Sequence, residues 1–158
     1  KVHIPLAYYA AYYSIRAKAF DAQYMIFGKE KVKNKMKEIE MKNQKKEATK
    51  AELDMYDDLE IVLEMYERGF EFLPVDIYES EASKFKIQDN KLRPPLNSIP
   101  GFGTVAAQGI VNARKDGKFM SIDDLKIRAK IGASGAELLK QFGCLEGMSQ
   151  SNQLSLFG

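Results

Sequence analysis

The chain has 158 residues, of which 45% are hydrophobic, enough for one sizeable core or two small ones. Its 24 basic residues nearly balance its 22 acidic ones. The single cysteine, Cys144, and the single histidine, His3, exclude an internal disulfide and a zinc site built from these residue types. The single cysteine favours a reducing compartment such as the cytoplasm. Because no run of about eighteen apolar residues occurs, we expect no membrane partner.

The charges are segregated along the sequence. Residues 29–50 hold nine lysines against four glutamates, residues 51–81 hold eleven acids against one arginine, and residues 84–130 hold ten bases against four acids. Such segregation suggests that one face avoids polyanions and another can meet them. The acidic block alone is typical of a solvated helix face.

The first half of the chain predicts helices. The run LAYYAAYYSIRAKAF after Pro5 predicts a buried helix. Its four tyrosines indicate core packing, or docking against chain upstream, rather than a stacking platform for bases. Residues 29–42 predict an amphipathic helix with a basic face. Thr49 and Glu52 have the spacing of a capping box before a long helix that ends at Arg68. The predicted apolar stripe of that helix consists of Leu53, Tyr56, Leu59 or Glu60, Leu63, and Tyr66 or Glu67.

Two segments in the middle of the chain predict short strands. Residues 70–80, FEFLPVDIYES, mix aromatic and β-branched side chains, and residues 85–96, FKIQDNKLRPPL, contain an Asp89-Asn90 turn. The glycine-punctuated remainder is helical again. We therefore expect an α+β fold that is mostly helical, with a small β hairpin.

A glycine pair gives the most specific internal signal. In residues 96–107, LNSIPGFGTVAA, the glycines can bring amide groups up to a ligand at the positive end of a following helix, which creates a seat for an anion. The pattern resembles the helix-hairpin-helix motif, which grips the DNA backbone without reading sequence. A plain helix turn remains the structural alternative. The candidate DNA-binding residues are Ile99, Gly101, Phe102, Gly103, Thr104, Arg114, Lys115, Lys118, Lys126 and Arg128.

A second half echoes the first. Ser121 can cap a helix with the sequence DDLKIRAK, Ile131-Gly132-Ala133 predicts a turn, and GAELLKQF predicts a last helix. Because this copy lacks the Gly-x-Gly form, we expect it to pack within the domain rather than bind the DNA backbone through its amides. Lys126, Arg128 and Lys130 could still touch the DNA backbone.

The tail ends in an apolar motif behind a small polar stretch. Apolar residues on a leash indicate a ligand for a pocket of another protein, although they could also fold back on the domain. The sequence QLSLF resembles the binding motif for the bacterial sliding clamp, the β subunit. That resemblance implies that Gln153 orients the peptide and that Leu156 and Phe157 anchor it, with Leu154 and Ser155 between them.

The segments HIPLAYYAAYYSIRA, PPLNSIPGFGTVAAQGIVNARKDGKF, GCLE and NQLSLF together resemble the C-terminal end of the PolC-type DNA polymerase III family. The resemblance implies three parts: residues 1–69 as the helical end of the fingers, residues 70–147 as a duplex-binding domain with paired helix-hairpin-helix motifs, and residues 148–158 as a flexible tail that binds the clamp. It also implies primer-template DNA and the upstream palm and fingers as partners, and a place in the replisome at the nucleoid. Since the chain does not begin with methionine, we expect a piece of a larger protein.

For the whole polypeptide the resemblance implies DNA-directed DNA polymerase activity with Mg²⁺ and a 3′-5′ exonuclease. The catalytic aspartates would lie upstream, so this chain should hold no catalytic residue, no cofactor and no metal; Asp57 and Asp58 read as surface carboxylates. Two other functions stay open. One is a stand-alone accessory module of DNA repair or recombination, and the other is a protein-interaction module that uses the acidic helix.

Overall fold

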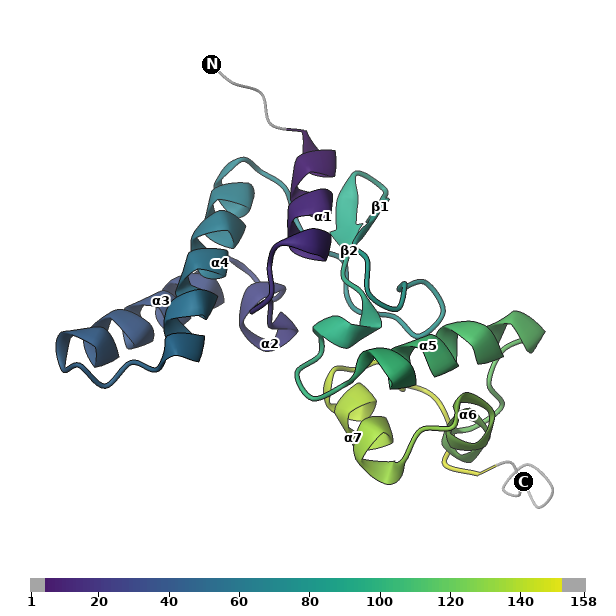
Figure 1. Ribbon diagram of the computed structural model, residues 1–158. Helices are drawn as coiled ribbons and strands as arrows, with labels where there is room; N and C mark the ends of the chain where they lie inside the picture. Colours follow the sequence, from purple (N-terminus) through teal and green to yellow (C-terminus); the bar gives the residue numbers. More distant parts are fainter. Residues whose placement is uncertain (1–4, 152–158) are drawn as a thin grey trace. The chain divides into compact units, whose positions relative to one another are not determined.

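The computed structural model describes residues 5–151 (Figure 1). The predicted clamp-binding residues, 153–157, lie outside this range. The predicted α+β, mostly helical class is confirmed. The elements are α1 (Leu6–Ile15), α2 (Ala22–Met25), α3 (Lys29–Gln44), α4 (Lys50–Glu67), β1 (Lys86–Gln88), β2 (Lys91–Arg93), the 3₁₀ turn η1 (Leu96–Ser98), α5 (Thr104–Ala113), the 3₁₀ turn η2 (Arg114–Asp116), α6 (Ile122–Ala129) and α7 (Ala133–Gln141).

The chain forms two compact units that interleave in sequence. Unit 1 contains the residues up to Pro74 together with Lys84–Pro94, and unit 2 contains Val75–Ser83 together with the residues from Pro95 onward. The β hairpin, which the predicted ranges place with residues 70–147, is thus grouped with the N-terminal helices.

Aromatic side chains form the centre of unit 1. Tyr9 and Tyr13 of α1 are buried, and Tyr13 packs against Phe20 and Phe85 with ring centroids 5.3 Å from each. The Tyr9 hydroxyl donates to Glu64 Oε1 of α4 at 2.6 Å. Burial and this carboxylate raise the pKa of Tyr9 to about 12. The predicted core role is confirmed for these two tyrosines, whereas Tyr8 is half exposed.

Helix α4 begins at the predicted capping box. The Thr49 hydroxyl accepts from the Glu52 amide at 3.1 Å, and the Glu52 carboxylate accepts from the Thr49 amide at 3.0 Å. The Lys42 ammonium, 2.7 Å from Glu52, and the Thr49 amide lower the pKa of Glu52 to about 2.

The predicted apolar stripe of α4 is shifted around the helix. The residues that α4 buries are Asp58, Leu59, Val62 and Met65, whereas Leu53 is 40% exposed. Apolar residues occupy more than one face of this helix, so two stripes with helical spacing fit the sequence. The face that packs into the unit 1 core, beside Val32 and Ile39 of α3, is the second one.

The hairpin has the predicted turn, but its partner segment is not a strand. Asp89 and Asn90 have φ of +54° and +58°, as a two-residue turn between twisted strands requires. In residues 70–80 only Phe72 forms a bridge, to Leu92. The predicted strand is wrong there because the Asp76 carboxylate accepts from the amides of Tyr78 and Glu79 and folds the chain into a local turn.

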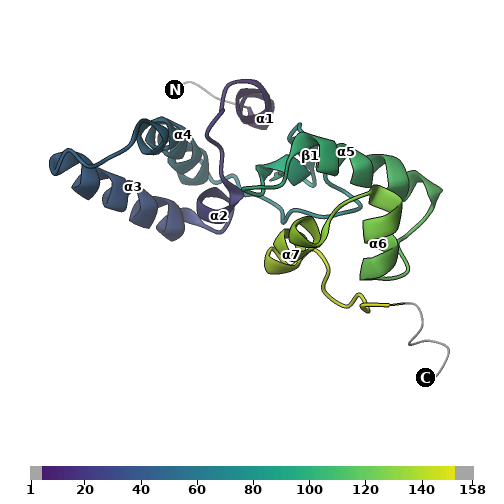
Figure 2. The ribbon, with the colours of Figure 1, turned by 60° about the horizontal axis from the view of Figure 1, so that its bottom comes forward.

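Unit 2 is built from α5, α6 and α7 (Figure 2). Its fully buried side chains include Ile110 of α5, Leu125 of α6 and Leu139 of α7. The segment Val75–Ser83 joins this unit because the carbonyls of Glu81 and Ala82 accept from the amides of Leu96 and Asn97, at 2.8 and 3.1 Å.

Candidate nucleic-acid interface

The glycine pair forms an exposed turn before α5, here called the first turn (residues 99–104). Gly101 has φ of +85°, which favours glycine, and the Phe102 amide donates back to the Ile99 carbonyl at 3.0 Å. Gly103 is the extended residue that precedes α5, and no atom lies within 4 Å of a Cβ built on it. The side chains of Ile99 and Phe102 are buried, so contact from these two residues to DNA would use main-chain atoms.

Residues 128–133, here called the second turn, resemble the first turn at three positions between α6 and α7, although the Ile131 amide donates five residues back, to the Lys126 carbonyl at 3.1 Å. Lys130 takes the place of Gly101 with φ of +59°, and Ile131 takes the place of buried Phe102. Gly132 takes the place of Gly103, again extended and with nothing within 4 Å of an added Cβ. The second copy has therefore lost one glycine from its sequence but keeps the positive φ and the extended glycine that precedes the helix.

Both turns lead into helices that lack a side-chain cap. Ser121 caps α6 by accepting from the Asp124 amide at 3.0 Å, but α5 and α7 begin at Gly103 and Gly132 without such a bond. The first amides of a helix carry its partial positive charge and need acceptors. The starts of α5 and α7 are thus suited to bind anionic oxygens.

The two turns are neighbours within unit 2. A Cβ added to Gly135, near the N-terminus of α7, would lie 3.4 Å from the Phe102 ring. A Cβ added to Gly101 would lie 3.4 Å from Leu138 of α7. The first turn therefore packs on α7 directly behind the second turn.

The two candidate arginines have partners inside unit 2. Arg114 Nη1 donates to the carbonyls of Ile77 and Ser80, at 3.0 and 2.6 Å. Arg128 donates to the carbonyls of Ala113, Gly117 and Lys118 at 2.8–3.0 Å, and it pairs with Asp124 at 3.2 Å. Because these bonds fix the guanidinium groups to loops, we assign both arginines a structural part, and their contact with DNA stays a prediction.

The candidate lysines are more accessible. Lys115, Lys118 and Lys130 are exposed, and Lys126 is half-buried. Helix α6 has Asp123 and Asp124 near its N-terminus, and its basic residues lie near its C-terminus, toward residues 128–133. A polyanion would therefore be attracted to the C-terminal end of α6 and repelled from the other end.

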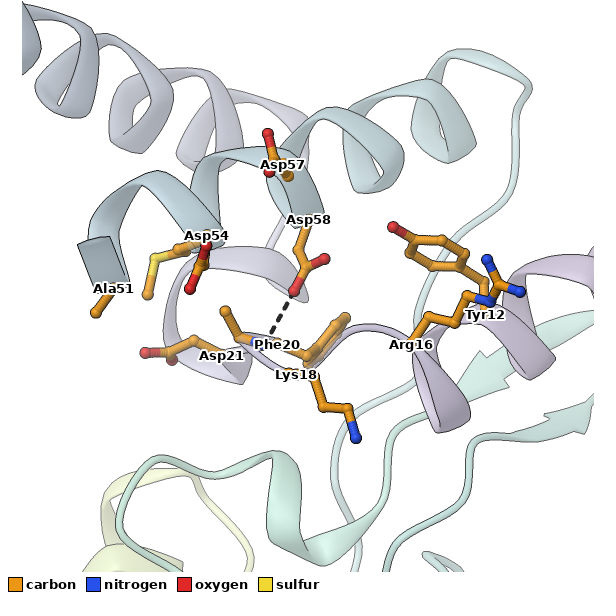
Figure 3. Close-up of a pocket in the computed structure, with 11 residues that line it drawn as sticks. Tyr12, Arg16, Lys18, Phe20, Asp21, Ala51, Asp54, Asp57 and Asp58 are labelled. Carbon is orange, nitrogen blue, oxygen red and sulfur yellow. Dashed lines mark hydrogen bonds between the residues drawn. The ribbon is translucent and has the colours of Figure 1, made fainter. Parts of the chain in front are cut away.

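The acidic residues of α4 border a cavity of about 680 Å³ in unit 1 (Figure 3). Asp58 and Asp57 point away from each other, and Asp58 Oδ2 accepts from the Ala19 amide at 3.0 Å. The prediction of a solvated face is thus wrong for Asp58, which is 5% exposed because it caps the loop after α1. Within residues 5–151, no three His, Cys, Asp or Glu side chains are placed to hold a metal ion. Nor does any helix there have the length and apolarity to cross a membrane.

The sequence predicted a turn at Gly132 but no phosphate seat, and it assigned Gly109 no role in packing. Gly132 gave no Gly-x-Gly signal, because its partner position is Lys130 in a left-handed conformation that lysine seldom adopts. Gly109 lies where α5 crosses α6, and a Cβ added there would be 2.3 Å from the Ala129 carbonyl oxygen. Its only sequence signal was a glycine inside a helical pattern, which often marks close packing.

The chain matches known proteins over its whole length. The helix-hairpin-helix motif family matches residues 69–154. DNA polymerase III PolC-type of Clostridium perfringens is 47% identical over 158 residues, and the protein with this name from Caldanaerobacter subterraneus is 46% identical over 157 residues. The one from Streptococcus pneumoniae is 45% identical over 157 residues. These alignments cover 99–100% of this chain and 11% of each relative, so the chain spans about a ninth of their length. The predicted resemblance is confirmed: the chain belongs to the helix-hairpin-helix family and is similar throughout to PolC-type DNA polymerase III.

Proposed function

We propose that this chain is the part of a PolC-type DNA polymerase that holds the primer-template duplex and tethers the enzyme to the sliding clamp. The observation that carries the proposal is the pair of matching turns, each of which presents an uncapped, glycine-led helix start to solvent. Each seat suits a backbone phosphate and reads no bases, as an enzyme that advances along DNA requires.

In this proposal the second turn binds a phosphate, whereas its sequence had predicted a packing role. Its backbone matches the first turn at Gly132, and it adds the exposed Lys130 ammonium at the same place. Lys115, Lys118 and Lys126 supply further positive charge, so affinity should fall steeply as salt rises. The identity of the relatives over the whole chain favours the polymerase over a stand-alone repair module.

The chemistry of DNA synthesis would belong to the rest of the polypeptide. Phosphoryl transfer requires carboxylates that converge on Mg²⁺ ions, which would neutralise the reacting phosphates. Asp57 points away from Asp58, and no three such side chains converge among the described residues, so we propose no Mg²⁺ site there. We expect the chain alone to extend no primer, while the complete protein is the polymerase and exonuclease.

The clamp contact is proposed from the sequence of residues 153–157. Gln153 would set the register, and Leu156 and Phe157 would fill an apolar cleft on the ring. A duplex contact and a clamp contact on one polypeptide raise its effective concentration at the primer end, and processive synthesis follows.

Replacing both exposed glycines tests the duplex contact. Gly103→Val with Gly132→Val should weaken binding to a random-sequence duplex by about tenfold per turn, because each side chain blocks a phosphate seat. The fold should tolerate both changes, since neither glycine has a positive φ or a neighbour within 4 Å of an added Cβ. Fluorescence anisotropy across several salt concentrations measures the affinity.

Gln141→Val is the matched control, because Gln141 is exposed and lies at the far end of α7 from the second turn. It should leave the affinity unchanged. If the double glycine variant keeps its thermal stability and its duplex affinity, the proposed seats are wrong.

A further inference from the structure

The segment after α7 is fastened to the start of α6. The Ser149 carbonyl accepts from the Ile122 amide at 2.9 Å, and the Gln150 carbonyl accepts from the Asp123 amide at 3.0 Å. The Gln150 side chain adds a bond from Nε2 to Asp123 Oδ1 at 3.1 Å. In Figures 1 and 2 this yellow stretch passes beside α6. The expected tail of residues 148–158 therefore starts with residues that are held in place.

These bonds satisfy amide groups that a helix cannot satisfy itself. The Ser121 hydroxyl accepts from the Asp124 amide. The carbonyls of residues 149 and 150 accept from the two preceding amides of the helix, those of Ile122 and Asp123. Upstream, Leu145 is buried and its carbonyl accepts from the Met148 amide at 3.1 Å. The chain is thus tied down from the core to Gln150, and detaching it would leave helix amides without these partners.

The attachment lies at the end of α6 opposite the second turn. Helix α6 has eight residues, so about 12 Å separates its first amides from residue 130. The attachment end carries Asp123 and Asp124, and the other end carries Lys126, Arg128 and Lys130. The attachment and the second turn therefore occupy opposite ends of α6.

We propose that Ser149 and Gln150 form a fixed anchor that presents the clamp-binding peptide, so that the ring is held on a short tether beside unit 2. The inference rests on the proposed clamp contact. Only Ser151 and Asn152 separate Gln150 from Gln153, so at most about 10 Å of chain lies between the anchor and the peptide. A tether that began at Met148 would have five residues and could reach about 17 Å.

A linker insertion tests the length of the tether. Twelve Gly and Ser residues placed between Ser151 and Asn152 lengthen the three-residue path to fifteen. Effective concentration falls roughly as the −3/2 power of length, so affinity for a duplex that carries a bacterial sliding clamp should fall about tenfold. Affinity for the free clamp and for the bare duplex should not change, because both contacts are intact.

A second pair of variants tests the anchor itself. Ile122→Pro removes the amide that binds the Ser149 carbonyl. The helix should tolerate it, because proline suits the first helical position and Ser121 before it is extended, with φ of −166°. Ile122→Ala also shortens the side chain but keeps the amide. We expect about twofold weaker binding to the clamp-loaded duplex for Ile122→Pro than for Ile122→Ala, together with faster hydrogen exchange at the Asp123 amide.

The outcomes separate the anchor from the proposed function. If the unaltered chain does not bind the free clamp, the clamp contact fails. If it binds, yet the linker insertion leaves affinity for the clamp-loaded duplex unchanged, the fixed anchor is wrong while the clamp contact stands. Should Ile122→Pro fail to fold, the insertion still decides.

Discussion

Asp58 differs in burial from the other acidic residues of its helix. It belongs to a helix whose other acids are mostly exposed, yet it is buried and accepts the Ala19 amide at 3.0 Å. Burial raises the pKa of its carboxyl above the usual 3.8, and the charges of Asp57 and Asp54 act in the same direction, while the Ala19 amide opposes them. The fold therefore favours the neutral form of this side chain.

Asp58→Asn should stabilise unit 1 at pH 7, because the amide oxygen can still accept from Ala19 and no charge is buried. We expect the free energy of unfolding to rise by roughly 0.5–1.5 kcal/mol. A carboxyl with a raised pKa stabilises the fold only while it is protonated. The advantage of the variant should therefore shrink as pH falls through the raised pKa of Asp58 and vanish below the ordinary pKa of 3.8.

Urea denaturation at several pH values measures this difference, and Asp57→Asn is the control because Asp57 is exposed on the same helix. A loss of stability at pH 7 in Asp58→Asn, absent from Asp57→Asn, would mean that the carboxylate form is the one the fold requires.

Among the elements, the crossing of α5 and α6 is the one most sensitive to size. At Gly109 the backbone of α5 approaches the Ala129 carbonyl so closely that an added Cβ would lie 2.3 Å from the oxygen. At Gly135 in α7 an added Cβ would meet the Phe102 ring at 3.4 Å, an ordinary contact. Both glycines lie in helices, so they make a matched pair.

Gly109→Ala should lower the free energy of unfolding by about 1–3 kcal/mol, because α5 must move away from α6. Gly135→Ala should be neutral or stabilising by up to about 1 kcal/mol, since alanine is the better helix former. Thermal unfolding of both variants measures the two effects. Equal stability of the two would show that the helices do not cross so closely.

The elements that the sequence predicted correctly are those with local causes. The capping box of Thr49 and Glu52, the Asp89-Asn90 turn and the Ser121 cap each depend on a few adjacent residues. The failures involve distant partners: Asp76 turned an expected strand into a local turn, and the core chose a different face of α4. The short helix α2 was not predicted, because four residues give too little periodicity to detect.

In the candidate site, too, the features with local causes were predicted and those that depend on distant residues were not. The sequence identified the first turn, because two glycines and a helix start are adjacent. It did not predict that the Arg128 guanidinium donates hydrogen bonds to the carbonyls of three other residues. Nor did it predict that Lys130 adopts a left-handed conformation, with φ of +59°. Both facts depend on where loops meet in space, and a charge count cannot show this.

At the scale of the whole molecule, the two units share the chain in alternating segments. The hairpin segment Lys84–Pro94 contributes Phe85 and Leu92 to the unit 1 core, and both flanking segments belong to unit 2. The hydrogen bonds from Leu96 to Glu81 and from Asn97 to Ala82 hold those flanks side by side. A short link can therefore replace the hairpin, whereas a single cut cannot separate the units.

We expect residues 75–151, with Lys84–Pro94 replaced by two glycines, to unfold in one cooperative transition and to bind duplex with the affinity and salt dependence of the whole chain, within about threefold. An uninterrupted piece of residues 69–151 should instead aggregate, because Phe85 and Leu92 lose Tyr9 and Tyr13 and are exposed. Calorimetry, light scattering and salt titration of duplex binding compare the two pieces. The excised piece also lacks the nine lysines of residues 29–50, so a loss of affinity beyond tenfold with a shallower salt dependence would move part of the duplex contact to unit 1.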